Sequence, residues 1–185
     1  MLGNMHFKWE RPAGLRVLPA PRKTSILFVC MGNICRSPTA EGVMRKLAAD
    51  AGLQNYVLVD SAGTHDYHVG GPPDPRAQAA AWRRGYDLGS LRARQIAASD
   101  FENFDLLLAM DTNNLGLLQC MCPVRHQSKV RLLMNYASGI NSATVPDPYA
   151  RGAPSDFERV LDYVENACGG LLKVLSHTYA DAAVR

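Results

Sequence analysis

Apolar positions in this chain form short continuous runs that alternate with longer amphipathic stretches. Residues 25–30 are almost uniformly apolar, which is typical of a strand buried on both faces of a sheet. Further strands are predicted over residues 56–62, 104–110 and 129–134, and helices over residues 37–52, 74–84, 111–121 and 155–177. Strands that alternate with helices predict an α/β domain with a parallel sheet and helices on both faces.

Helix ends and loops refine this prediction. Ser37 is a plausible N-cap with Pro38 at the first helical position, and Ser155 is expected to cap the last helix, with Glu158 three residues later. Ligands of parallel sheets bind beyond the carboxyl ends of the strands. The loops to search for a site are therefore residues 31–36, 63–75 and 135–154.

Length and charge exclude several classes of protein. The 185 residues, 47% of them hydrophobic and 20% charged, suit one globular domain, and no apolar run is long enough to cross a bilayer. Residues 1–24 carry a net charge of +4 and residues 25–185 a net charge of −1. We therefore predict a flexible basic extension over residues 1–24, a domain over residues 25–185, and no nucleic-acid partner.

The cysteines indicate free thiols and a cytoplasmic protein. Their odd count argues against a disulfide scaffold, and the Cys120-Met-Cys122 spacing does not suit zinc. His65 and His68 flank Asp66 in a glycine-rich loop, where exposed histidines are a simpler interpretation than metal ligands. We expect no metal site.

The loop after the first strand has the features of an anion site. Cys30 and Arg36 stand at its ends, and Gly32 and Asn33 tolerate left-handed backbone better than most residues. Consecutive backbone N–H groups, the following helix N-terminus and the Arg36 guanidinium can all face one phosphate. Cys30 in that field is a candidate nucleophile. The residues predicted to contact the anion are Met31, Gly32, Asn33, Ile34, Cys35, Arg36 and Ser37.

Cys35 has two interpretations. Its thiol could trap oxidised Cys30 as a disulfide, which would stop oxidation at a reversible step. It could equally be a small packing residue, because proximity alone does not make a thiol reactive.

Residues 27–40, which read Leu-Phe-Val-Cys-Met-Gly-Asn-Ile-Cys-Arg-Ser-Pro-Thr-Ala, resemble the phosphate loop of the low-molecular-weight protein-tyrosine phosphatases. The resemblance extends over about residues 25–177 and includes further motifs at residues 60–64, 72–76, 92–95 and 147–149. It implies a flavodoxin-like, four-stranded parallel sheet and hydrolysis of phosphotyrosine proteins through a phosphocysteine. It also implies that neither cofactor nor metal is needed.

The resemblance assigns a role to individual residues. Cys30 matches the nucleophile, Arg36 the phosphate-binding arginine, Asp147 the general acid, and Ser37 the serine that supports the thiolate leaving group. By itself, an Asp before Pro is more often a turn residue.

The loop support and the slot walls are matched as well. Asn33 and Ser61 match the pair that holds the loop in shape, and Tyr67 and Tyr149 match the aromatic walls of the substrate slot. Leu91 replaces a histidine that often joins the Asn33 network, so this network must close in another way.

The resemblance also leaves alternatives and suggests a setting. Ala150 after Tyr149 is typical of bacterial members, which often oppose a tyrosine kinase of polysaccharide export. A thiol-dependent arsenate reductase would need distal cysteines, for which Cys120 and Cys122 are the candidates. A protein-arginine phosphatase would carry threonine in place of Ile34. A phosphate-binding pseudoenzyme is disfavoured because every catalytic position is filled.

Overall fold

The computed structural model describes residues 22–149 and 152–183. Its sheet contains β1 (Thr24–Cys30), β2 (Val57–Gly63), β3 (Leu106–Ala109) and β4 (Val130–Leu132), in the order β2-β1-β3-β4. All neighbouring strands are parallel, which confirms the predicted four-stranded sheet. The predicted extension over residues 1–24 falls almost entirely outside the described residues.

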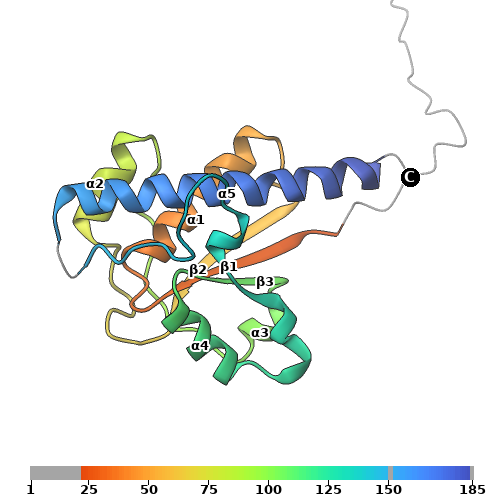
Figure 1. The fold of residues 1–185 in the computed structure, drawn as a ribbon, viewed down its shortest axis with the longest axis horizontal. Helices are drawn as coiled ribbons and strands as arrows, with labels where there is room; N and C mark the ends of the chain where they lie inside the picture. The colour runs from red at the N-terminus through yellow and green to blue at the C-terminus, as the bar shows by residue number, and fades with distance from the viewer. Residues whose placement is uncertain (1–21, 150–151, 184–185) are drawn as a thin grey trace, which may run out of the picture.

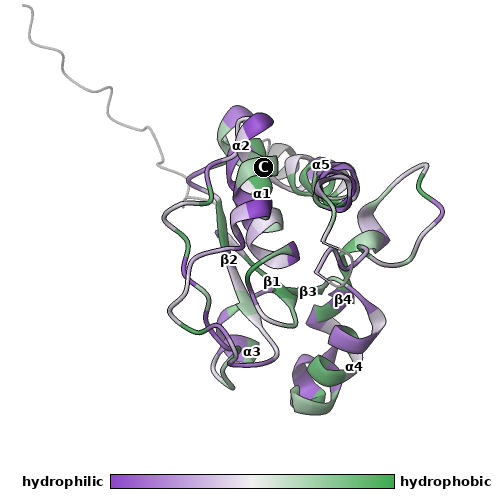
Figure 2. Cartoon of the chain, turned by 90° about the vertical axis from the view of Figure 1, so that its left-hand side faces the viewer, coloured by the Kyte–Doolittle hydropathy of each residue, from purple (hydrophilic) through white to green (hydrophobic). Residues whose placement is uncertain are grey.

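Helices cover both faces of the sheet, as predicted (Figures 1 and 2). The longer ones are α1 (Arg36–Asp50), α2 (Pro75–Arg83), α4 (Thr112–Met121) and α5 (Pro154–Ala183). Successive side chains of a strand point to opposite faces, so Ile26 and Phe28 pack under α1 and α5, whereas Leu27 and Val29 pack toward α4. No helix among the described residues is long and apolar enough to cross a membrane.

Short elements escaped the sequence analysis. These are α3 (Asp100–Asn103) and two 3₁₀ turns, Val124–Lys129 and Leu133–Tyr136. Four to six residues are too few to show a helical period. The last helix also continues six residues beyond its predicted end at residue 177.

Both predicted helix caps are wrong. α1 begins at Arg36, so Ser37 lies within its first turn, and its hydroxyl contacts Cys30 instead of capping the helix. α5 begins at Pro154, because proline suits the first helical position. The carboxylate of Asp156, not of Glu158, accepts the bond from the Ala153 N–H.

Candidate active site

The candidate site lies where β1 ends and α1 begins, at the carboxyl edge of the sheet (Figure 1). The connecting loop carries its left-handed residue at Asn33, with a φ of 55°, and not at Gly32. Gly32 is needed for space, since a Cβ there would come within 2.9 Å of the His68 ring. α1 begins without a side-chain cap. The positive end of its helix dipole faces the loop.

The Cys30 thiol is buried beside a hydroxyl. Its Sγ lies 3.0 Å from Ser37 Oγ, and Ser37 Oγ also lies 3.2 Å from the Ala62 carbonyl oxygen. The Ser37 hydroxyl can therefore donate to the sulfur when the sulfur carries negative charge. This geometry suits the role that the family resemblance gives to Ser37.

Asn33 and Ser61 are connected as the sequence analysis expected. The Asn33 amide donates to Ser37 Oγ at 2.9 Å and to Ser61 Oγ at 2.8 Å, and its oxygen accepts from the Arg94 N–H at 2.8 Å. Every polar group of the Asn33 side chain is thus used. These bonds stabilise the left-handed backbone at Asn33.

Glu41 closes the network in the absence of the histidine. Its carboxylate accepts from the Ser61 hydroxyl, while Leu91 packs against the apolar core. Glu41 is only 3% exposed, and burial raises the pKa of its carboxyl despite the bonds from Ser61 and Arg45. Glu41 was not predicted from the sequence, although a carboxylate between small and apolar residues of a helix was a signal for it.

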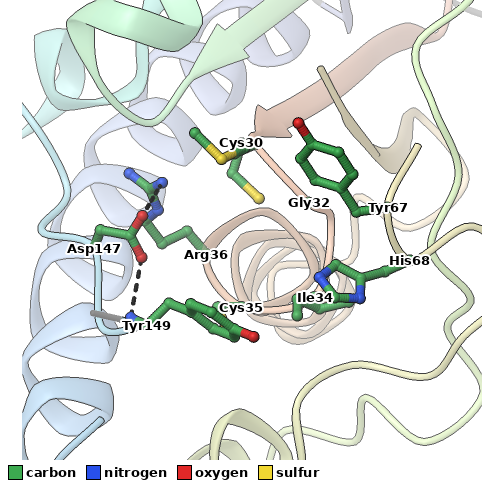
Figure 3. Close-up of a pocket in the computed structure, with 10 residues that line it drawn as sticks. Cys30, Gly32, Ile34, Cys35, Arg36, Tyr67, His68, Asp147 and Tyr149 are labelled. Atoms are coloured by element: carbon green, nitrogen blue, oxygen red, sulfur yellow. Dashed lines mark hydrogen bonds and ion pairs between the residues drawn. The ribbon is translucent and has the colours of Figure 1, made fainter. Parts of the chain in front are cut away.

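Arg36 joins two carboxylates at the mouth of the site. It is 3% exposed and donates to Asp111 Oδ2. It also donates to Asp147 Oδ2 at 2.8 Å (Figure 3). Burial opposes its charge, but Cys30, Asp147 and Asp111 together hold the pKa of the guanidinium above its usual value. The carboxylate of Asp111 also caps α4 through the Asn114 N–H.

Asp147 lies on a loop that leads to α5. Its side chain is 45% exposed, and its second oxygen accepts from the Tyr149 N–H at 3.1 Å. The carboxylate is therefore held in place while it remains open to solvent and to a bound ester. In sequence Asp147 is 111 residues from Arg36, and only the fold brings the two together.

Cys30, Arg36 and Asp147 line a common pocket of about 330 Å³. Tyr67 and Tyr149 stand on opposite sides of it, with exposed fractions of 69% and 57% (Figure 3). The pocket is lined by Cys30, Met31, Gly32, Ile34, Cys35, Arg36, Tyr67, His68, Asp147 and Tyr149. Asn33, Ser37 and Ser61 lie behind it as support, so of the predicted contact residues Asn33 and Ser37 do not line the cavity.

His68 is a pocket residue that the sequence analysis placed only in a solvent-exposed loop. It lies against Gly32, and His65 of the same loop stacks on the Tyr67 ring at 5.1 Å. Among the described residues, no group of three His, Cys, Asp or Glu side chains is placed to hold a metal ion.

Of the other cysteines, Cys35 lies in the pocket, whereas Cys120 and Cys122 lie outside it. Cys35 lines the pocket but is largely buried, and burial together with nearby Asp74 raises the pKa of its thiol. Cys30 and Cys35 are both free, and their disulfide stays a prediction. Cys120 and Cys122 lie at the end of α4 opposite to Asp111, remote from the pocket.

Comparisons with known proteins agree on one family. Residues 25–180 match the model of the family described as low molecular weight phosphotyrosine protein phosphatase. The chain is 40% identical to the low molecular weight protein-tyrosine-phosphatase YfkJ of Bacillus subtilis, over 80% of this chain and 93% of the relative. It is 44% identical to a putative phosphatase of the same description from Synechocystis, over 81% and 95%.

Solved structures give the same result. The crystal structure of YfkJ superposes with a TM-score of 0.81 at 38% identity and covers 86% of this chain and 98% of its own. A protein tyrosine phosphatase from Entamoeba histolytica, crystallised with Hepes in its active site, also has a TM-score of 0.81, at 39% identity, with 85% and 99% covered.

Proposed function

This chain belongs to the low molecular weight phosphotyrosine protein phosphatase family of cysteine-dependent hydrolases, and we propose that Cys30, Arg36 and Asp147 are its catalytic residues. The observation that carries the proposal is their convergence on one pocket from two segments of the chain, the loop of residues 30–36 and the loop of Asp147, which is 111 residues from Arg36. The pocket offers a nucleophile, a fixed cation and a proton donor, which together suffice for hydrolysis of a phosphate ester.

The reaction follows from this geometry in two steps. Cys30 Sγ attacks the phosphorus, an S–P bond forms, and the bond to the tyrosine oxygen breaks. Asp147 gives its proton to the leaving phenolate, so Asp147 must be protonated when the ester binds. Arg36 and the N–H groups of residues 31–36 stabilise the charge on the equatorial oxygens.

The second step returns the enzyme to its starting state. Asp147, now a carboxylate, takes a proton from a water molecule that attacks the phosphocysteine. The S–P bond breaks, inorganic phosphate leaves, and the Ser37 hydroxyl, whose Oγ lies 3.0 Å from Cys30 Sγ, stabilises the departing thiolate.

The substrates of the family are phosphotyrosine proteins, and the pocket walls of this chain support that class. Tyr67 and Tyr149 present two exposed rings between which a phenyl ring can stack. Ile34 lines the pocket where a protein-arginine phosphatase would carry threonine. The remote position of Cys120 and Cys122 argues against the arsenate reductase, which needs a thiol relay to Cys30.

A more specific setting follows from the sequence. Ala150 after Tyr149 is typical of the bacterial members, so we propose a bacterial tyrosine kinase of polysaccharide export as the protein substrate. The five free cysteines support a cytoplasmic location.

The first prediction tests Cys30. Cys30→Ser should abolish turnover of a phosphotyrosine peptide and still bind inorganic phosphate, because Arg36 and the loop N–H groups remain. Hydrolysis is measured beside phosphoserine and phosphoarginine peptides and arsenate reduction, and phosphate binding by calorimetry. Cys120→Ser, which changes an exposed thiol remote from the pocket, is the control and should keep full activity. Activity of Cys30→Ser above a trace would rule out covalent catalysis by Cys30.

A further inference from the structure

Asp74 connects the start of α2 to the phosphate loop. Its backbone N–H donates to the carbonyl oxygen of Ile34 at 2.8 Å, and its carboxylate caps α2 through the Arg76 N–H. The same buried carboxylate holds the Arg76 guanidinium by two bonds, at 3.0 Å to Nε and 2.7 Å to Nη2. The Arg76 side chain is thus fixed relative to the loop that binds phosphate.

The other side of this guanidinium faces the loop that carries Asp147. Arg76 Cζ lies 4.8 Å from the centroid of the buried Phe157 ring and 5.9 Å from the centroid of the Tyr149 ring. Arg76 Nη1 lies 3.4 Å from the Gly152 carbonyl oxygen. Gly152 has a φ of 72°, and a Cβ there would come within 2.6 Å of Nη1, so the backbone approaches the guanidinium directly.

From these contacts we propose that Arg76 is a positioning residue: it seats the Tyr149 ring as a wall of the substrate slot by bridging the phosphate loop and the Asp147 loop. The loop needs such support, because residues 146–149 belong to no helix or strand and the Tyr149 ring is more than half exposed. A planar cation held on one edge by a carboxylate is suited to this role, since its face stays free to stack on aromatic rings.

The proposal rests on the function proposed above, and it separates two parts of substrate binding. Phosphate is bound by Arg36 and the loop N–H groups, which Arg76 does not touch. The phenyl ring is bound by the slot walls, one of which Arg76 holds. Loss of Arg76 should therefore weaken binding of the aryl ester and leave binding of inorganic phosphate unchanged.

Arg83 provides a matched control. It belongs to the same helix and also pairs with α5, through Glu158, but it does not contact the Asp147 loop. Arg76→Gln should raise KM for a phosphotyrosine peptide about three- to tenfold, the range expected for a partly exposed cation–aromatic contact. Arg83→Gln should leave KM unchanged, and neither variant should change the inhibition constant of inorganic phosphate.

A double-variant cycle shows whether Arg76 acts through Tyr149. In a Tyr149→Ala background, Arg76→Gln should change KM by less than about twofold, because the ring that it holds is gone. Arg76→Lys keeps the charge but not the planar face, so it should raise KM in the same direction by a smaller factor. This variant also keeps the test valid if Arg76→Gln folds poorly.

The experiments distinguish failure of the positioning role of Arg76 from failure of the proposed function. An unchanged KM in Arg76→Gln, an equal change in both backgrounds, or a weaker inhibition by phosphate would overturn the positioning role and leave the proposed function intact. A wild-type protein that does not hydrolyse the phosphotyrosine peptide would overturn the proposed function, and this inference with it.

Discussion

Asp147 is held by Arg36 and by the Tyr149 N–H, so its place in the pocket does not depend on a bound ester. A tyrosine leaving group has a pKa near 10 and departs poorly without a proton, and a positioned acid contributes about 10²–10⁴-fold. Asp147→Asn should therefore slow phosphotyrosine hydrolysis by about that factor and slow an aryl phosphate with a more acidic phenol much less. Both are measured as kcat across a range of pH.

The pH profile gives a second measure of the same residue. A decline of kcat with rising pH that reports loss of the proton from the general acid should be absent in Asp147→Asn. Equal slowing of the two esters would contradict the acid role. The next candidates for the acid would be Asp111, which also contacts Arg36, and Asp66 of the loop 63–75.

Glu41 gives a prediction about stability and pH. Burial raises the pKa of its carboxyl in the folded state above the unfolded value. The folded state therefore holds this proton more firmly, and the stability that Glu41 contributes is complete below the unfolded pKa, about 4.3, and is lost as pH rises through the folded pKa. Glu41→Gln removes this dependence.

The free energies of unfolding of wild type and Glu41→Gln should accordingly diverge in favour of the variant as pH rises from about 4 to 7. Urea titrations at several pH values measure this difference. Glu158→Gln is the control of opposite sign: ion pairs with Arg83 and Arg84 lower the pKa of Glu158, so the stability that Glu158 contributes is present above about pH 4.3 and is lost as pH falls below it. A difference between wild type and Glu41→Gln that does not vary with pH would refute the prediction.

Two adjacent glycines in α5 test how closely this helix packs on its neighbour. A Cβ at Gly170 would come within 1.9 Å of the Tyr136 carbonyl oxygen in the turn Leu133–Tyr136, whereas a Cβ at Gly169 would meet nothing within 4 Å. Gly170→Ala should destabilise the fold by about 1–3 kcal/mol through overpacking. Gly169→Ala should stabilise it by about 0.5–1 kcal/mol, because alanine is the better helix former.

Urea denaturation of the two variants provides the measurement. Since the two residues are neighbours in one helix, the intrinsic helix preference is the same and only the contact with Tyr136 differs. Changes of the same sign in both variants would show that α5 can move away from the turn without cost.

Hydrogen bonds connect the last turns of α5 with the beginning of β1. Tyr179, near the end of α5, bonds through its hydroxyl to the Thr24 N–H at 2.9 Å and to the Tyr56 carbonyl oxygen at 2.8 Å. Ser25 in turn bonds to Asp105 through its N–H and its hydroxyl. These contacts predict that the stable domain starts at the beginning of β1.

A truncation series tests this boundary. A chain that starts at residue 22 should keep the kcat/KM and the free energy of unfolding of the full chain, since the family match begins at residue 25. A chain that starts at residue 26 should lose stability, at about 0.5–1.5 kcal/mol for each hydrogen bond removed. Loss of activity or stability in the chain that starts at residue 22 would show that residues 1–21 contribute to the domain.

The sequence by itself determined the sheet, the main helices and the phosphate loop of this protein. Continuous apolar runs belong to strands buried on both faces, so their positions can be read without knowledge of the partners. The loop could be predicted because Cys30, Arg36 and the residues between them are neighbours in the chain, and a strand followed by a helix fixes their geometry. Short elements such as α3 could not, because its four residues, of which Asp100 and Phe101 are buried, are too few to show a helical period.

The tertiary structure decided which distant residues complete the site. From the residues alone Asp147 is a turn aspartate, and only the family resemblance gave it the acid role. The fold places it 2.8 Å from Arg36, and it likewise brings Glu41 to Ser61 and Arg76 to Tyr149. These contacts depend on how α1, α2 and the loop before α5 pack on one edge of the sheet. Local sequence cannot reveal them, because the distance between two side chains far apart in the chain is fixed only when the core between them is packed.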